Sequence, residues 1–99
     1  MRGFYFYRMN RCYHITVQGK VQGVFFRAST KQMADILGIR GFVRNEPSGD
    51  VYIEAEGDEE MLIRFIQWCH HGPEKATVHM VSVSEGTWTG AGTFEISRP

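Results

Sequence analysis

The change of hydrophobic period between residues 13 and 37 constrains the fold more than any other feature of this sequence. Apolar and polar side chains alternate from Tyr13 to Gln18, which is the period of a half-buried strand. After two glycines at positions 19 and 23, the period becomes helical, with one face formed by Phe26, Thr30, Met33 and Leu37. This spacing predicts a helix from about Val24 to Leu37, with Gly38 as its left-handed cap. A strand, a glycine-containing loop and a helix therefore follow one another.

A turn and two further strands are predicted next. One strand fits Gly41 to Asn45, and the stretch from Glu46 to Asp50 has the turn composition that returns the chain into another. The alternation in this third strand predicts that Val51, Ile53 and Ala55 face inward and that Tyr52, Glu54 and Glu56 face water.

The second half of the chain predicts another helix and two more strands. Asp58 is the expected N-cap, and the apolar stripe of the helix consists of Leu62, Phe65, Ile66 and Cys69. Gly72 and Pro73 stop this helix. Val78 and Val81 mark a fourth strand whose odd spacing indicates a bulge, and Phe94 and Ile96 mark a short last strand.

These elements predict an α+β fold of the ferredoxin-like, split βαβ type. Each strand has one apolar side, so both helices are expected on one face of an antiparallel sheet, with a short extra C-terminal strand. We expect residues 12–99 to form this single domain and residues 1–11 to form an N-terminal extension. The fold hosts RNA binders, metal carriers and enzymes alike, so the site must decide the function.

Composition narrows the classes of function. Eleven basic and eleven acidic residues cancel, which disfavours nucleic-acid and membrane partners, because both select a diffuse positive field. The aromatic stretch at positions 4–7 is too short for a secretory signal or a membrane span. Cys12 and Cys69 are interpreted as two buried thiols, and a cytoplasmic location is the default expectation. No cofactor is expected in a chain of this length.

The loop before the first helix is the best candidate for a site. Unpaired N–H groups at a helix N-terminus favour an anion, and Gly23 allows the backbone to approach a phosphate closely. Arg27 lies in the first predicted turn, where the helix dipole disfavours a positive charge. This mismatch indicates a functional residue, although a solvated helix arginine explains the spacing equally well.

Other arrangements predict no chemistry. The four histidines lack metal-ligand spacing, His70 and His71 fit an exposed helix end, and the serines lack the glycine-flanked turn of a serine hydrolase. No metal site is therefore expected. The acidic residues near position 58 fit a solvated strand face and a helix cap.

Two stretches resemble the signatures of the acylphosphatase family. Gly19-Lys-Val-Gln-Gly-Val-Phe-Phe-Arg27 is similar to the first, Gly-x-Val-Gln-Gly-Val-x-Phe-Arg. Gly38-Ile-Arg-Gly-Phe-Val-Arg-Asn45 is similar to the second, in which Gly-x-x-Gly precedes an aromatic, a small apolar, a basic residue and Asn. The resemblance runs from about Cys12 to Ile96 and implies the same ferredoxin-like fold.

The resemblance also implies the chemistry, which is metal-independent hydrolysis of small acyl phosphates. According to this resemblance, Arg27 binds the phosphate and Asn45 orients the attacking water. The phosphate-binding loop then consists of the backbone N–H groups of Gln22, Gly23, Val24, Phe25, Phe26 and Arg27. Inorganic phosphate and sulfate are expected to compete with substrate. On spacing alone, Asn45 fits a turn residue before Glu46 and Pro47.

The sequence departs from the family pattern at two places. Glu46 follows Asn45 where many members have a small or neutral residue, and we expect it to face solvent. The chain ends in Ser97-Arg98-Pro99 rather than near an aromatic residue. The alternative function is a non-catalytic module on the same fold that binds a phosphorylated ligand or RNA, although the RNA-binding aromatic pattern is only partly present.

Overall fold

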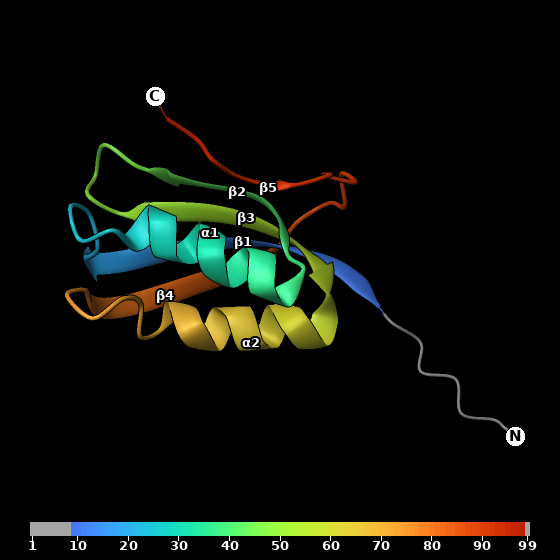
Figure 1. The fold of residues 1–99 in the computed structure, drawn as a ribbon, viewed down its shortest axis with the longest axis horizontal. Coiled ribbons are helices and arrows are strands. Elements are labelled where there is room, and N and C mark those ends of the chain that lie inside the picture. Colours follow the sequence, from blue (N-terminus) through green and yellow to red (C-terminus); the bar gives the residue numbers. More distant parts are fainter. Residues whose placement is uncertain (1–8, 99) are drawn as a thin grey trace, which may run out of the picture.

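Five strands and two helices follow one another in the computed structural model, which describes residues 9–98 (Figure 1). In chain order they are β1 (Asn10–Lys20), α1 (Phe26–Leu37), β2 (Arg40–Asn45), β3 (Val51–Asp58), α2 (Glu59–Cys69), β4 (Thr77–Glu85) and β5 (Phe94–Ile96). The predicted order of elements is therefore confirmed.

The strands form one sheet in the order β4-β1-β3-β2-β5. The four longer strands pair antiparallel, as predicted, whereas β5 pairs parallel with β2, so the complete sheet is mixed. This direction follows because β4 runs opposite to β2 and the connection of residues 86–93 reverses the chain once before it reaches the free edge of β2. The predicted bulge is also present, since β1 is paired with Met80 and then with Val78, which leaves His79 as the extra residue.

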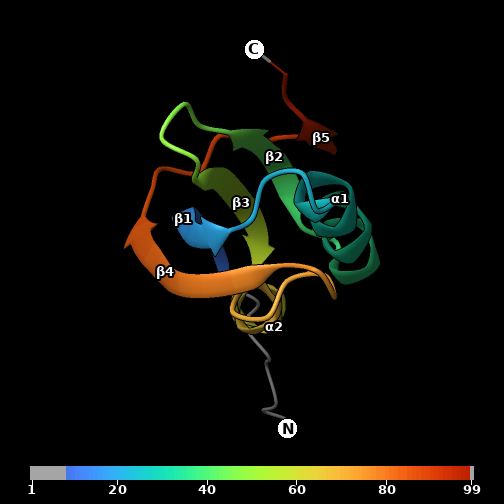
Figure 2. The same ribbon diagram turned by 90° about the vertical axis from the view of Figure 1, so that its left-hand side faces the viewer.

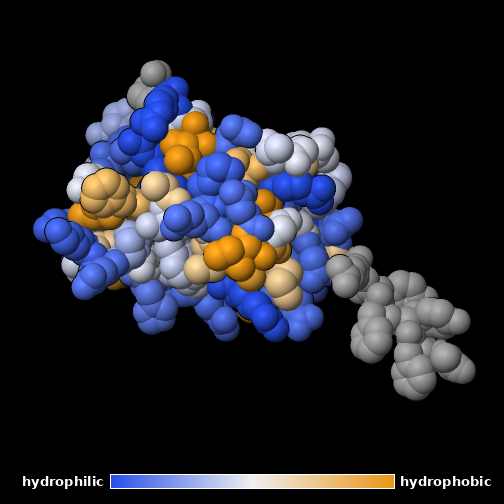
Figure 3. All heavy atoms as spheres, viewed as in Figure 1, coloured by the Kyte–Doolittle hydropathy of each residue, from blue (hydrophilic) through white to orange (hydrophobic). Residues whose placement is uncertain are grey.

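Both helices cover the same face of the sheet, as predicted (Figure 2). Helix α1 packs on β2 and β5, α2 packs on β1 and β3, and the two helices contact each other. Their inward side chains close one hydrophobic core, whose largest members are Phe26, Phe65, Phe94, Ile15, Ile39, Ile53 and Leu62. Outside this core, the helix-covered face shows separate apolar patches among hydrophilic side chains (Figure 3).

The sheet begins before the predicted domain boundary at Cys12. Asn10 and Arg11 already belong to β1, where they pair with Asp58 and Gly57. The Arg11 guanidinium also lies 2.6 Å from the carboxylate of Glu85. β1 therefore includes two residues of the expected extension, and residues 1–8 of that extension lie outside the described residues.

Glu56 departs most from the predicted alternation, because its expected water-facing side chain is only 3% exposed. Residues 86–93, which connect β4 to β5, pass over Glu56 and cover its side chain. The Glu56 carboxylate accepts hydrogen bonds from the N–H groups of Thr89 (3.0 Å), Gly90 (2.9 Å) and Ala91 (3.3 Å), and from the Thr89 hydroxyl. Burial by itself raises the pKa of this carboxyl, but these hydrogen bonds outweigh it and leave the pKa below its ordinary value.

The helix ends follow the predictions with two corrections. Gly38 caps α1 with φ 70°, as expected, but α1 begins at Phe26, two residues later than predicted. Asp58 is the N-cap of α2, yet its side chain makes no capping hydrogen bond. The Glu59 N–H donates instead to the carbonyl of Met9 at 2.9 Å. No helix within residues 9–98 is long and apolar enough to cross a membrane.

Candidate active site

The loop between β1 and α1 forms the first wall of the site. Gly23 and Phe25 both adopt left-handed backbone conformations, with φ of 73° and 61°. A Cβ added at Gly23 would meet no other atom within 4 Å, so conformation rather than crowding favours glycine there. For a bulky residue such as Phe25 the same conformation is strained, and strain of this kind gathers at functional sites.

The backbone N–H groups of this loop are open. Among residues 9–98, no N–H from 22 to 27 donates to a protein acceptor, and the first bond of the helix runs from Ser29 N–H to the Phe25 carbonyl at 3.0 Å. No acidic residue lies in the first turn of α1. N–H groups without an acceptor and a helix N-terminus without an acidic residue together favour a bound anion.

The turn between β2 and β3 forms the opposite wall. Asn45 is the last residue of β2 and pairs with Val51. The side-chain amide of Gln22 donates to the carbonyls of Glu46 and Asp50, both at 2.9 Å, and so ties this turn to the β1–α1 loop. The Oδ1 atom of Asn45 is buried and has no hydrogen-bond partner in the described part of the chain. Such an acceptor is costly unless something in the site uses it.

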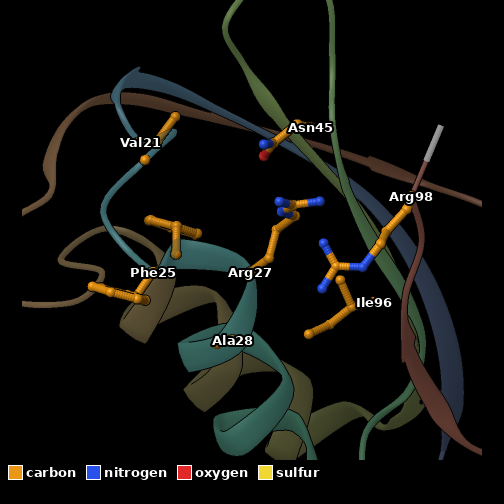
Figure 4. A pocket seen from close by; sticks show the side chains of 9 residues that line it. Val21, Phe25, Arg27, Ala28, Asn45, Ile96 and Arg98 are labelled. Carbon is orange, nitrogen blue, oxygen red and sulfur yellow. The ribbon is translucent and has the colours of Figure 1, made fainter.

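A pocket of about 280 Å³ lies between these walls (Figure 4). Its lining brings together five of the predicted site residues, namely Gly23, Phe25, Phe26, Arg27 and Asn45. The Arg27 guanidinium extends from α1 toward the Asn45 amide across the pocket (Figure 4).

Two predicted loop residues are not part of the pocket lining. The side chain of Gln22 is turned to the β2–β3 turn, and that of Val24 is only 7% exposed, in the core. Their side chains therefore support the loop, whereas only their backbone N–H groups are available for the predicted role.

The neighbours of Asn45 point away from the pocket. The Arg44 guanidinium lies 4.8 Å from the ring centroid of Tyr52 on the open face of the sheet, as the alternation predicts. Its Nε atom donates to the Glu46 carboxylate at 2.8 Å. Glu46 is therefore directed away from the pocket, which agrees with the expectation that it does not repel an anion there. Burial and a hydrogen bond to Glu54 raise the pKa of Tyr52 to about 12.

Four residues of the pocket lining were not predicted as site residues, namely Val21, Ala28, Ile96 and Arg98. Ile96 and Arg98 reach the site because β5 lies beside β2 and carries the chain past the N-terminus of α1 (Figure 1). The Phe-x-Ile ending marked this strand, but nothing in its period revealed the neighbour or the direction of pairing. The unusual Ser97-Arg98-Pro99 ending was the one available signal.

The remaining candidates lie outside the pocket. Cys12 and Cys69 are free and buried, as predicted, and burial raises the pKa of Cys69 to about 12. His70 and His71 are exposed at the end of α2, also as predicted. The described residues contain no group of three or more His, Cys, Asp or Glu positioned around a metal.

The fold and the pocket together indicate a class of protein. A ferredoxin-like domain with an arginine, an asparagine and unpaired backbone N–H groups at one cavity has the features of a small anion-binding protein. The comparisons with known proteins narrow this class to one family.

The family model described as acylphosphatase matches residues 13–96. An acylphosphatase from Nocardioides sp. is 44% identical over 88 residues, which cover 89% of each chain. Another, from Marinobacter nauticus, is 52% identical over 73 residues, which cover 74% of this chain and 79% of that protein. The crystal structure of acylphosphatase from Bacillus subtilis has a TM-score of 0.86 at 37% identity, covering 90% of this chain and 99% of that one. The chain belongs to the acylphosphatase family.

Proposed function

We propose that this protein hydrolyses the carboxyl-phosphate bond of small acyl phosphates in the pocket between α1 and β2. The observation that carries the proposal is the meeting of Arg27, Asn45 and the open N–H groups of the β1–α1 loop around one cavity. Inorganic phosphate and sulfate occupy the same site as competing anions. The two buried free thiols are compatible with the proposed location in the reducing cytoplasm.

The phosphate end of the substrate is held by charge and by backbone N–H groups. The planar guanidinium of Arg27 donates two parallel hydrogen bonds to phosphoryl oxygens, and the N–H groups of residues 22–27 donate further ones. These donors are in place before the substrate arrives, so they stabilise the charge of the transition state without reorganisation. Gln22 contributes by tying the loop to the turn that carries Asn45.

Asn45 positions the nucleophile. Its orphaned Oδ1 accepts a hydrogen bond from a water, and the neutral amide adds no charge that would repel the phosphate. The water oxygen attacks phosphorus, the bond from phosphorus to the acyl oxygen breaks, and the carboxylate leaves with the electron pair. One water proton stays on the attacking oxygen and the other passes to a phosphoryl oxygen, so the products are a carboxylate and dihydrogen phosphate.

This reaction needs no metal ion. The carboxylate is a good leaving group, and the phosphoryl group is its own proton acceptor, so positioning and charge stabilisation supply the catalysis.

Hydrolysis of benzoyl phosphate in the presence of a chelator tests the proposal. We expect turnover that the chelator does not reduce and that inorganic phosphate inhibits competitively. Loss of activity with the chelator would refute the metal-free reaction. Folded protein that binds phosphate without turnover would instead favour the non-catalytic alternative.

A further inference from the structure

The pocket contains more positive charge than the phosphate-binding role requires. Arg27 and Arg98 both line it, and no carboxylate belongs to its lining. Neither guanidinium forms an ion pair with another residue of the described range 9–98. Arg27 and the N–H groups of the loop already face the phosphate in the proposed function, so Arg98 is a second cation without an assigned partner.

The fold holds the backbone next to Arg98 in a defined place. Ile96 pairs with Val43 on β2, and the Ser97 N–H donates to the Val43 carbonyl at 2.8 Å. The chain is therefore anchored to β2 up to the residue before Arg98. From there the Arg98 side chain enters the pocket beside Ile96 (Figure 4).

The geometry of phosphoryl transfer assigns this side of the pocket to the acyl group. In the transition state the attacking and leaving oxygens lie roughly in line on opposite sides of phosphorus. In Figure 4 the Arg27 guanidinium lies between Asn45 on one side and Arg98 with Ile96 on the other. If Asn45 positions the water, the leaving carboxyl and its carbon chain extend toward Arg98 and Ile96.

We propose that Arg98 is a specificity-determining residue, which favours acyl phosphates whose acyl group carries a second carboxylate. Ile96 contacts the carbon chain, and the Arg98 guanidinium pairs with the distal carboxylate. This inference rests on the proposed function, because it uses the direction of attack that Asn45 sets. It adds the substrate class, which the phosphate-binding residues do not determine.

A matched pair of aromatic substrates tests the inference. We would compare kcat/KM for 4-carboxybenzoyl phosphate with that for 4-carbamoylbenzoyl phosphate, which is nearly isosteric but lacks the charge. Arg98 is exposed, so we expect its charge to raise the ratio of carboxylate to amide substrate by about two- to fivefold over that of Arg98→Gln, which cancels the different leaving groups. The preference should decrease as salt screens the pair.

Three variants isolate the charge of Arg98 through this ratio. Arg98→Gln should lower the ratio by about two- to fivefold, Arg98→Lys should keep part of the wild-type value, and Arg98→Glu should lower the ratio below that of Arg98→Gln. Arg64→Gln changes an exposed arginine of α2 that does not line the pocket, and it should leave the ratio unchanged. The ratio cancels any common loss of active protein.

The outcomes that overturn the inference differ from those that overturn the proposed function. An equal ratio in wild type and Arg98→Gln, with turnover of both substrates, refutes the role of Arg98 alone. Parallel loss on both substrates together with weaker inhibition by inorganic phosphate would make Arg98 a phosphate ligand instead. Absence of turnover of every acyl phosphate by the folded wild type overturns the proposed function and this inference with it.

Discussion

Two clusters of backbone N–H groups in this molecule are built alike but used differently. The N–H groups of Thr89, Gly90 and Ala91 surround a carboxylate that the protein itself supplies, that of Glu56. The N–H groups of residues 22–27 have no acceptor within residues 9–98, and the pocket beside them is lined by no carboxylate. In the first, which we call the closed cluster (residues 89–91), the donors are satisfied within the fold. In the second, the open cluster (residues 22–27), the donors remain available to a ligand. The first set of donors stabilises the fold, and the second is the proposed binding site for the phosphate of the substrate.

The residues of the open cluster also favour a ligand. The open cluster carries Arg27 and a strained Phe25, and the first turn of its helix has no acidic residue. The positive charge at the helix N-terminus and the strained backbone both cost folding free energy, so a function is the physical reason to retain them.

The largest expected effect comes from the shape of the cation in the open cluster. Arg27→Lys keeps the charge but loses the planar fork, so we expect turnover of benzoyl phosphate to fall by about two orders of magnitude or more. Steady-state kinetics with benzoyl phosphate measure this loss of turnover. Arg44→Lys is the matched control, because Arg44 lies on the opposite face of the sheet, and its activity should stay close to that of the wild type. Equal losses in both variants would show that the assigned faces are wrong.

A smaller effect is expected when a substitution places a carboxylate beside the open cluster. Ala28 is exposed, lines the pocket and lies in the first turn of α1. Ala28→Glu should raise KM for benzoyl phosphate by roughly tenfold through repulsion of the phosphate. Its melting temperature should not fall, because an acidic residue suits a helix N-terminus. The neutral Ala28→Gln controls for size, and an equal KM in the two variants would argue against an anion site there.

In the closed cluster we expect a loss of stability rather than of chemistry. Glu56→Gln replaces a charged acceptor of four hydrogen bonds and should cost about 1–3 kcal/mol of unfolding free energy at neutral pH, while the kcat for benzoyl phosphate stays unchanged. Exposed Glu74→Gln is the control and should have little effect on unfolding.

The pH dependence of this loss has a definite sign. The pKa of Glu56 is lower in the folded protein than the ordinary value of 4.5, so its contribution is complete above that pH. The contribution is lost as the pH falls through the folded-state pKa. Denaturant unfolding of wild type and Glu56→Gln should therefore converge toward acid. A difference that grows on acidification would contradict the lowered pKa.

The sequence predicted the open cluster better than the closed one. The period change at residue 24, the glycines and the misplaced charge of Arg27 are local signals, and Arg27 does lie in the first turn of α1. The burial of Glu56 was not predictable from the alternation of β3, because the cover comes from residues 86–93, which have no period of their own. Arg98 was missed for a similar reason, since its place depends on parallel pairing between β5 and β2.

Arg27 and Asn45 have different roles in the proposed reaction, and thermal unfolding with inorganic phosphate tests these roles directly. At a hundred times Kd, a ligand that binds only the native state stabilises it by about 2.7 kcal/mol, which corresponds to a melting shift on the order of 10 °C for a domain of this size. Sodium chloride at equal ionic strength controls for screening.

We predict that Asn45→Ala keeps most of this phosphate-dependent shift while losing turnover, because the anion-binding donors remain in place. Arg27→Ala should lose both the shift and the turnover. The opposite pattern, in which Asn45→Ala loses the phosphate shift and Arg27→Ala retains it, would contradict the assignment of the anion site to Arg27 and the β1–α1 loop.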